Sequence, residues 1–171
     1  GKTFGFGIPV VQRLGLDPSP GVKALIVVPT RELCVQVYED IDMLTKNRAT
    51  SVVAIYGGKA YEGQIDQLKA GAQIVVGTPG RLIDLNNQRL LDLSQASEVV
   101  LDEADKMLDL GFLPDIEKIF SKVPAIRHTQ LFSATMPGVI VTMARRFMSN
   151  PIHIRATDPD EGLTQANIKH L

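Results

Sequence analysis

The sequence predicts an α/β fold in which a mainly parallel sheet lies between two layers of helices, a three-layer sandwich. Short runs rich in Val and Ile alternate along the chain with segments of helical periodicity, which is the pattern of βα units. Most of these runs are apolar throughout, as expected for strands that are covered on both faces. The expected strands are 24–28, 51–56, 73–76, 98–101, 130–132 and 152–154.

The expected helices between these strands carry recognisable start signals. Thr30 precedes one helix, Thr78 followed by Pro79 opens another, and Pro137 opens a third. A further helix is expected over 61–70. An apolar stripe toward the sheet is predicted for the helix that begins after Thr30, from residues at helical spacing: Leu33, Val37, Ile41 and Leu44.

Two polar segments rich in Pro and Gly interrupt this pattern. Residues 17–21 are predicted to be a loop, and 157–162 a linker. We therefore expect one domain over 1–156, and a linker with the start of a second domain over 157–171.

Composition excludes several classes of protein. The 171 residues carry 18 Lys and Arg against 19 Asp and Glu, so a nucleic-acid site would have to be local and not a general basic excess. The single Cys34 rules out an internal disulfide framework and is expected to be a small core residue. No apolar run is long enough to span a membrane, and no signal peptide opens the chain, which favours a cytoplasmic location. The histidines lack metal-site spacing, so zinc is not expected.

The most informative feature is Asp102-Glu103-Ala104-Asp105, which directly follows the apolar run 99–101. Open α/β sheets place their chemistry at the carboxyl ends of strands. A carboxylate there can hold Mg²⁺ beside a nucleotide, and its neighbour can orient or deprotonate a water molecule. The alternative is a set of acids that stabilises the first turn of a helix, and without context the two interpretations are about even.

A second candidate site is Gly1-Lys2-Thr3, which matches the end of the phosphate-binding loop G-x-x-x-x-G-K-[ST]. In that loop the Lys pairs with the outer phosphates and the hydroxyl ligates Mg²⁺. Alone the tripeptide is weak, since most such tripeptides are surface turns. The prediction that gives it weight is spatial: Lys2 and Asp102 should meet around a magnesium-bound triphosphate.

Two expected helix starts could contact a nucleic-acid backbone from the same sheet edge, because free N–H groups at a helix N-terminus bind phosphate. Taken singly, each is better interpreted as a capped helix start. Paired glycines usually form a turn but also allow close approach of a ligand, and Ser133-Ala134-Thr135 alone would be a cap or an ST-turn. The residues concerned at this edge are Pro29, Thr30, Arg31, Gly57, Gly58, Thr78, Pro79, Gly80 and Arg81.

Taken together and in order, these segments resemble the motif series of the DEAD-box RNA helicases. The resemblance covers nearly the whole chain and rests on segments 1–3, 29–33, 57–58, 78–82, 102–105 and 133–135. It implies a RecA-like P-loop NTPase domain, the first of two in an ATP-dependent RNA helicase that separates short duplexes locally. The resemblance also implies that this chain is an N-terminally truncated fragment of such a protein.

The resemblance assigns roles to the residues around the nucleotide. Gly1, Lys2 and Thr3 would bind ATP, with Lys2 on the β and γ phosphates. Thr3 and Asp102 would hold Mg²⁺ directly or through water, and Glu103 would position the attacking water, so the catalytic set is Lys2, Asp102 and Glu103.

The resemblance assigns two further groups. Asp105 would hydrogen-bond toward Ser133 and Thr135 and couple the nucleotide state to RNA separation. RNA would be bound by Pro29, Thr30, Arg31, Gly57, Gly58, Thr78, Pro79, Gly80 and Arg81.

The family's adenine-recognition motif and most of its phosphate loop would lie upstream. The second RecA-like domain, with its arginine finger, would follow, and 167–171 resembles the start of its opening strand. The fragment alone would then be nearly inactive, because losing an arginine finger costs about 10³- to 10⁵-fold in rate. Two alternatives stay open: an ATP-gated RNA clamp, and a DNA translocase of the same superfamily.

Overall fold

The structure is a computed structural model and describes residues 2–16, 19–58, 60–149, 152–155 and 167–170. Five parallel strands build the main sheet: β1 (Ala24–Val27), β2 (Val52–Ile55), β3 (Ile74–Gly77), β4 (Glu98–Leu101) and β5 (His128–Leu131). Their order across the sheet is β2-β3-β1-β4-β5. β1 is therefore central, with β3 and β4 on either side, and β5 is an edge strand of the described sheet.

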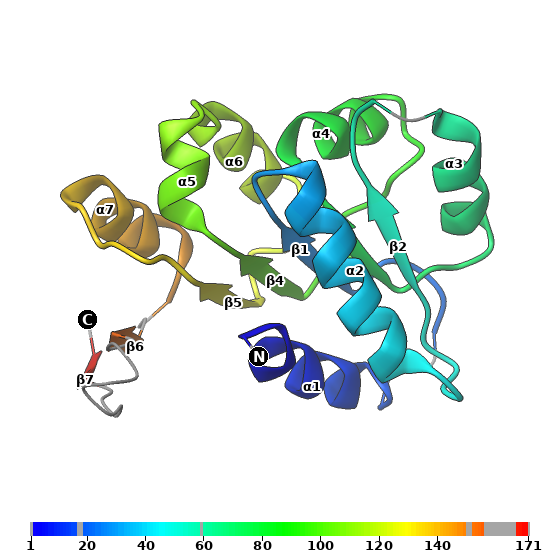
Figure 1. Ribbon diagram of the computed structural model, residues 1–171, viewed down its shortest axis with the longest axis horizontal. Coiled ribbons are helices and arrows are strands. Elements are labelled where there is room, and N and C mark those ends of the chain that lie inside the picture. The colour runs from blue at the N-terminus through cyan, green and yellow to red at the C-terminus, as the bar shows by residue number, and fades with distance from the viewer. Residues whose placement is uncertain (1, 17–18, 59, 150–151, 156–166, 171) are drawn as a thin grey trace.

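Helices cover both faces of this sheet, which confirms the expected three-layer α/β sandwich (Figure 1). The helices are α1 (Lys2–Leu14), α2 (Arg31–Thr45), α3 (Tyr61–Lys69), α4 (Pro79–Asn87), α5 (Ala104–Asp109), α6 (Leu113–Phe120) and α7 (Gly138–Phe147). α1 and α2 pack on one face, and α4 to α7 supply most of the core on the other. Among the described residues, no helix is both long and apolar enough to cross a membrane.

The central strand shows why the strands are apolar throughout. Ala24 and Ile26 pack with α1 and α2, whereas Leu25 and Val27 pack with the helices on the opposite face. Side chains alternate between the two faces of a strand, so a sheet covered on both sides needs an apolar residue at every position.

The helix α1 packs closely against α2. A Cβ atom at Gly7 would lie 2.7 Å from Ile41 Cδ1, so a larger residue here would require the Ile41 side chain to shift. Ile41 belongs to the predicted apolar stripe of α2 and is fully buried, as are Val37 and the neighbouring Cys34. The Cys34 thiol donates to Val76 O at 3.3 Å, and burial raises its pKa to about 12, which fits an unreactive core residue.

Two expectations need correction. Strand β5 begins at His128, two residues before the expected 130, because it is partly exposed and its first residues carry no apolar signal. The expected sixth strand does not join the parallel sheet. Instead, β6 (Ile152–Arg155) pairs antiparallel with β7 (Asn167–His170) in a separate two-stranded sheet. A short apolar run marks a strand but does not name its partner.

β7 coincides with most of the segment expected to open a second domain, and its membership of such a domain stays a prediction. The expected linker 157–162 lies outside the described residues.

Candidate nucleotide and nucleic-acid site

The acidic tetrad begins at the end of β4, a strand that lies between β1 and β5 in the sheet. Asp102 N donates to Val27 O of β1 at 2.9 Å, and Phe132 N, just after β5, donates to Leu101 O at 2.8 Å. The sheet register therefore continues one residue past the strand ends. As a result Asp102 is completely buried, with 0% of its surface exposed.

The structure brings Lys2 and Asp102 together, as the sequence predicts. Lys2 is the first residue of α1, and its Nζ lies 2.7 Å from Asp102 Oδ1. The Lys2 side chain is half exposed, and apart from this ion pair neither Asp102 oxygen has a hydrogen-bond partner among the described residues. A buried carboxylate in this state is unusual and is the kind of oxygen donor that a hard cation prefers.

Thr3 follows Lys2 in the first turn of α1 and is also buried, with 8% of its surface exposed. Gly1 lies outside the described residues. Among the described residues, no group of three or more His, Cys, Asp or Glu side chains could hold a metal ion. The donors at hand are one carboxylate and one hydroxyl. This small set fits Mg²⁺, which usually takes one or two carboxylates and completes its shell with water and substrate phosphates.

Glu103 adopts a left-handed backbone conformation, with φ 56° and ψ 52°. This conformation costs a non-glycine residue about 1–2 kcal/mol. Glu103 occupies the N-cap position of α5, yet its side chain makes no capping hydrogen bond. Glu103 therefore does not cap α5 through its side chain, while Asp105 lies in the first turn of α5, where the alternative interpretation expects an acid. A strained acid beside a buried one is typical of a functional site.

Asp105 joins the tetrad to the segment after β5. Its Oδ2 accepts from Thr135 N at 3.1 Å and from Thr135 Oγ1 at 3.0 Å. Asp105 N in turn donates to Ser133 Oγ at 3.2 Å, and Ser133 Oγ donates to Thr135 O at 2.6 Å. Ser133 thus accepts a hydrogen bond from the first turn of α5, as the capping interpretation expects. It also connects Asp105 with Thr135, as the coupling interpretation expects.

The pKa of Asp105 is lowered from its ordinary value of 3.8. Partial burial of Asp105 raises the pKa, but hydrogen bonds from Thr135, Lys106 N and Ser133 together outweigh it by stabilising the carboxylate. Asp105 is therefore an ionised acceptor near neutral pH, and the link to Thr135 is charge-assisted.

The predicted nucleic-acid residues gather at the ends of three adjacent strands, β2, β3 and β1. Thr30 caps α2, because its Oγ1 accepts from Leu33 N at 3.2 Å, whereas Thr78 makes no side-chain cap at the start of α4. Capping thus explains Thr30 but leaves the hydroxyl of Thr78 unexplained. Pro29 and Pro79 are buried, so their side chains belong to the packed interior below this edge.

Arg31 reaches from the start of α2 to the end of β2. Its guanidinium carbon lies 5.3 Å from the centre of the Tyr56 ring, a cation–π contact. A Cβ on Gly58 would lie 3.5 Å from Arg31 Nη1, and Gly58 has φ +80°. The Gly57-Gly58 turn therefore lies directly beside a predicted RNA-binding arginine. Gly57, Gly58, Gly80 and Arg31 are all exposed.

Sequence analysis missed Gln64 on α3, a helix that looked ordinary. Gln64 is buried, with 4% of its surface exposed, and its Oε1 accepts from Arg81 Nη1 at 3.3 Å. Its Nε2 donates to Tyr56 O at 3.2 Å. The available signal was helical spacing: Gln64 precedes Leu68 by one turn, and Leu68 packs on the core, so a polar residue occupies an inward position.

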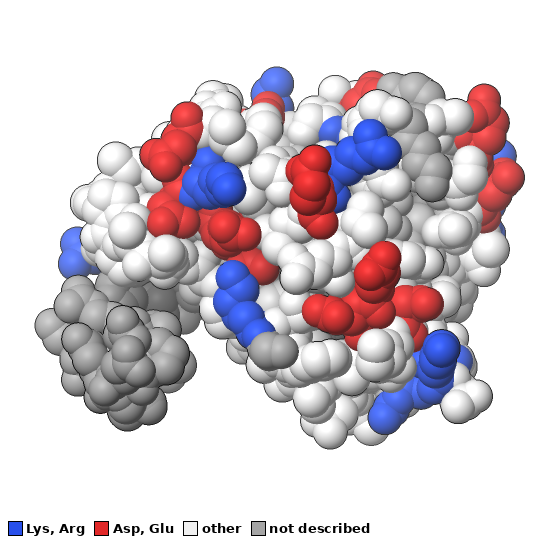
Figure 2. All heavy atoms as spheres, in the orientation of Figure 1, with Lys and Arg blue, Asp and Glu red and all other residues white. Residues whose placement is uncertain are grey.

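The visible surface carries Lys, Arg, Asp and Glu side chains interspersed, without one large basic field (Figure 2). This agrees with the formal net charge of −1 and favours local contacts over a general basic surface.

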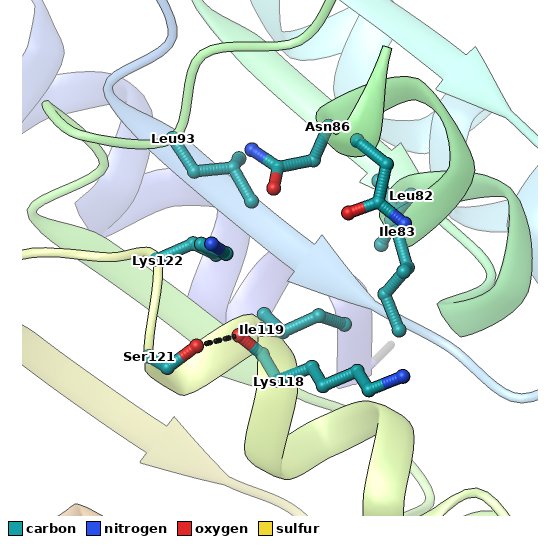
Figure 3. A pocket seen from close by; sticks show the side chains of 9 residues that line it. Leu82, Ile83, Asn86, Leu93, Lys118, Ile119, Ser121 and Lys122 are labelled. Carbon is teal, nitrogen blue, oxygen red and sulfur yellow. Dashed lines mark hydrogen bonds between the residues drawn. The ribbon is translucent and has the colours of Figure 1, made fainter. Parts of the chain in front are cut away.

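A cavity of about 260 Å³ lies between α4 and α6, and Leu82, which directly follows Arg81, is among the residues that line it (Figure 3). Asn86 of α4 and Lys122, just after α6, face it from opposite sides. None of the residues expected to bind ATP, Mg²⁺ or RNA lines this cavity.

The fold and the site together define a parallel α/β domain in which a lysine at the start of α1 meets a buried aspartate at the end of β4. A family model described as DEAD/DEAH box helicase matches residues 1–143. The chain belongs to this family.

Curated relatives and solved structures agree. The chain is 46% identical over 171 residues to a DEAD-box ATP-dependent RNA helicase CshA of Bacillus licheniformis, covering all of this chain and 34% of the relative. It is 49% identical over 155 residues to the ATP-dependent RNA helicase CshA of Listeria monocytogenes, covering 91% of this chain and 30% of the relative. The chain thus spans about a third of the length of these relatives.

Among solved structures, a yeast DEAD-box splicing factor superposes with a TM-score of 0.82 at 38% identity, covering 87% of this chain and 37% of that one. A DEAD box protein from the hyperthermophile Methanococcus jannaschii gives a TM-score of 0.81 at 44% identity, covering 88% of this chain and 40% of that one. The RecA-like α/β fold expected from the sequence is confirmed.

Proposed function

We propose that this chain is the first, ATP-binding RecA-like domain of an ATP-dependent RNA helicase, in which ATP hydrolysis stimulated by RNA drives local duplex separation. The observation that carries the proposal is the contact of 2.7 Å between Lys2 and the fully buried Asp102. It unites the end of a phosphate-binding loop with the acid at the end of β4, which are the two parts that nucleotide hydrolysis needs at one point.

Thr3 and Asp102 are the residues that would hold Mg²⁺. When bound, the ion would neutralise charge on the β and γ phosphates. Lys2 would then turn from Asp102 toward the outer phosphates, and half of its side chain is exposed on the solvent side. The cation would then balance the charge of Asp102, which the ion pair with Lys2 balances in this structure.

Glu103 would orient the attacking water and accept its proton. Its left-handed backbone comes directly after the buried Asp102 and changes the direction of the chain between the two carboxylates. Two neighbouring acids can thereby serve different purposes, one toward the cation and one toward the water. Asp105 would pass the nucleotide state to the Ser133–Thr135 segment through the hydrogen bonds described above.

RNA would bind at the ends of β1, β2 and β3, and a second RecA-like domain of the same protein would complete both sites. The proposal is supported by the exposed Arg31 at the start of α2, which lies beside the exposed Gly58. It is further supported by the CshA relatives, which are named as ATP-dependent RNA helicases. A cytoplasmic location belongs to the same proposal and rests on the free, buried thiol of Cys34.

The test is RNA-stimulated ATP hydrolysis by the protein that contains this chain, with Glu103→Gln. We expect turnover to fall by about 10²-fold or more, the usual contribution of a positioned general base. Glu62→Gln, at an exposed position of α3, is the matched control and should leave turnover unchanged. Undiminished turnover in Glu103→Gln would remove the role proposed for Glu103.

A comparison of RNA with DNA tests which polymer stimulates the protein. Single-stranded RNA and DNA of the same sequence are compared as stimulators of ATP hydrolysis, and a protein that contacts the 2′-OH should respond to RNA far more strongly. Equal stimulation would favour a DNA translocase. Strand separation of a short duplex, measured beside RNA residence time, distinguishes an unwinding enzyme from a clamp.

A further inference from the structure

The side chain of Gln64 is the most buried of the described α3 residues, although it is polar. Within positions 62–69 of this helix, every other residue is exposed or only partly buried. Burying a carboxamide without partners is costly, so such groups persist where hydrogen bonds offset the cost. Both ends of this amide are indeed bonded, to Arg81 and to the backbone of Tyr56.

The two bonds demand an amide. The amide donates to the carbonyl of Tyr56 and accepts from the guanidinium of Arg81, so it acts as donor and acceptor at once. A glutamate at this position could accept from Arg81 but could not donate to Tyr56 when ionised. A methionine of similar size could do neither.

Gln64 also joins segments that come from different strands. Tyr56 directly follows β2 and precedes the Gly57-Gly58 turn, while Arg81 lies in the first turn of α4, after β3. Arg31, after β1, stacks on the ring of Tyr56. All three predicted RNA-binding segments therefore meet in one set of contacts, and Gln64 supplies its polar centre.

We infer that Gln64 is a positioning residue for the nucleic-acid edge: its carboxamide holds Arg81 at a fixed place relative to the Gly57-Gly58 turn. This inference rests on the proposed RNA-binding function. A neutral acceptor orients the guanidinium without cancelling its charge. Arg81 has five N–H donors in a fixed fork, so a bond at one nitrogen sets the direction of the whole guanidinium plane. Ordering the side chain beforehand lowers the entropy lost when the polymer binds.

The experiment measures binding of a fluorescein-labelled single-stranded oligouridylate to the protein that contains this chain. Four forms are compared: the unchanged protein, Gln64→Met, Arg81→Ala, and the double variant. We expect Gln64→Met to weaken binding about 3- to 10-fold, as for the loss of one or two hydrogen bonds. In the Arg81→Ala background the same change should have no further effect, because Gln64 acts through Arg81.

Gln67→Met is the matched control, since Gln67 is a glutamine of the same helix with an exposed side chain. It should bind the oligouridylate like the unchanged protein. Thermal melting of each variant distinguishes loss of position from loss of fold.

Three results overturn the inference in distinguishable ways. If Arg81→Ala weakens binding but Gln64→Met does not, Gln64 has no positioning role and the proposed function stands. If the two effects add in the double variant, Gln64 acts elsewhere. If neither Arg81→Ala nor Arg31→Ala weakens binding, the proposed RNA edge itself fails, and the inference with it.

Gln64→Glu provides a second test should Gln64→Met melt below the assay temperature. The carboxylate would pair with Arg81 and compete with RNA phosphates for its guanidinium. Binding should then fall by at least about 3-fold relative to Gln67→Glu. Binding equal to that of Gln67→Glu would overturn the inference.

Discussion

Two regions at the same edge of the sheet are built in different ways. Around β4 and β5, ionised groups dominate: Lys2 pairs with Asp102, and Asp105 accepts from Thr135. At the ends of β1, β2 and β3, the contacts are neutral or involve only positive charge, as in the amide of Gln64 beneath Arg81. The first region, the acidic end, suits a cation and a triphosphate. The second, the arginine end, suits a polyanion.

The difference teaches how each region can fail. A buried charge left without its partner is expensive, so the acidic end should be sensitive to single charge changes. The arginine end depends on close backbone packing and on one neutral amide, so it should be sensitive to volume. The predictions below test this contrast and run from the largest expected effect to the smallest.

Gly77→Ala should give the largest loss of stability, at the arginine end. A Cβ at Gly77 would lie 2.7 Å from Leu82 Cγ and 3.0 Å from the Ile55 carbonyl oxygen, so β3 and α4 would have to separate. We expect the free energy of unfolding to fall by about 3 kcal/mol, as for overpacking of a tight core, in urea titrations. Gly63→Ala, on a face of α3 with no atom within 4 Å, is the control and should not destabilise. A stable Gly77→Ala variant would show that volume does not limit this end.

Lys2→Met should destabilise the acidic end through charge. It leaves the carboxylate of Asp102 buried without a cation nearby, at a cost of about 2 kcal/mol in the free energy of unfolding. Adding Asp102→Asn should recover part of this loss, because the buried charge disappears. Lys106→Met, at an exposed position of α5, is the matched control. No recovery in the double variant would contradict the charge-based account.

Asp105→Asn should cost about 1 kcal/mol near neutral pH, the usual net value of a charge-assisted link at a partly exposed site. The folded protein lowers the pKa of Asp105 below 3.8, so its contribution is present above that value and is lost as the pH falls through the lowered pKa. The stability gap between the two forms should therefore close in acid below about pH 4. Asp109→Asn, an exposed acid of the same helix, should show no such closure.

Glu103→Gly should have the smallest effect on stability, with the opposite sign. Glycine adopts the left-handed backbone without steric cost, although it gains entropy in the unfolded chain, so we expect a net gain of about 0.5 kcal/mol. ATP hydrolysis should nevertheless be lost. Arg89→Gly, at φ 61° after the end of α4, should give a similar gain with activity kept. Loss of stability in Glu103→Gly would mean that the glutamate side chain supports the fold.

Much of this molecule could be predicted from its sequence. The apolar runs located β1 to β4 because strands buried on both faces have apolar residues at nearly every position. The resemblance to a family motif series predicted that Lys2 lies near Asp102, although the two residues are far apart in the chain. It also paired Asp105 with Thr135, a contact that neither residue suggests by itself.

Other features escaped prediction for identifiable reasons. The start of β5 is missing from the apolar pattern because His128 is exposed at the sheet edge. The pairing of β6 with β7 depends on strand geometry, which short sequence runs do not encode. Gln64 is polar, so it looked like a surface residue until its neighbours were placed around it.

What the sequence by itself determined is the order of strands and helices, the class of fold and the residue types at the strand ends, since local periodicity and ordered motifs are properties of the chain. Only the tertiary structure decided which of these groups are buried and which partners satisfy them. Burial and hydrogen bonding depend on elements that are distant in sequence, and this is why the buried ion pair of Asp102 with Lys2 and the bond of the Gln64 amide to Arg81 became visible only in the folded protein.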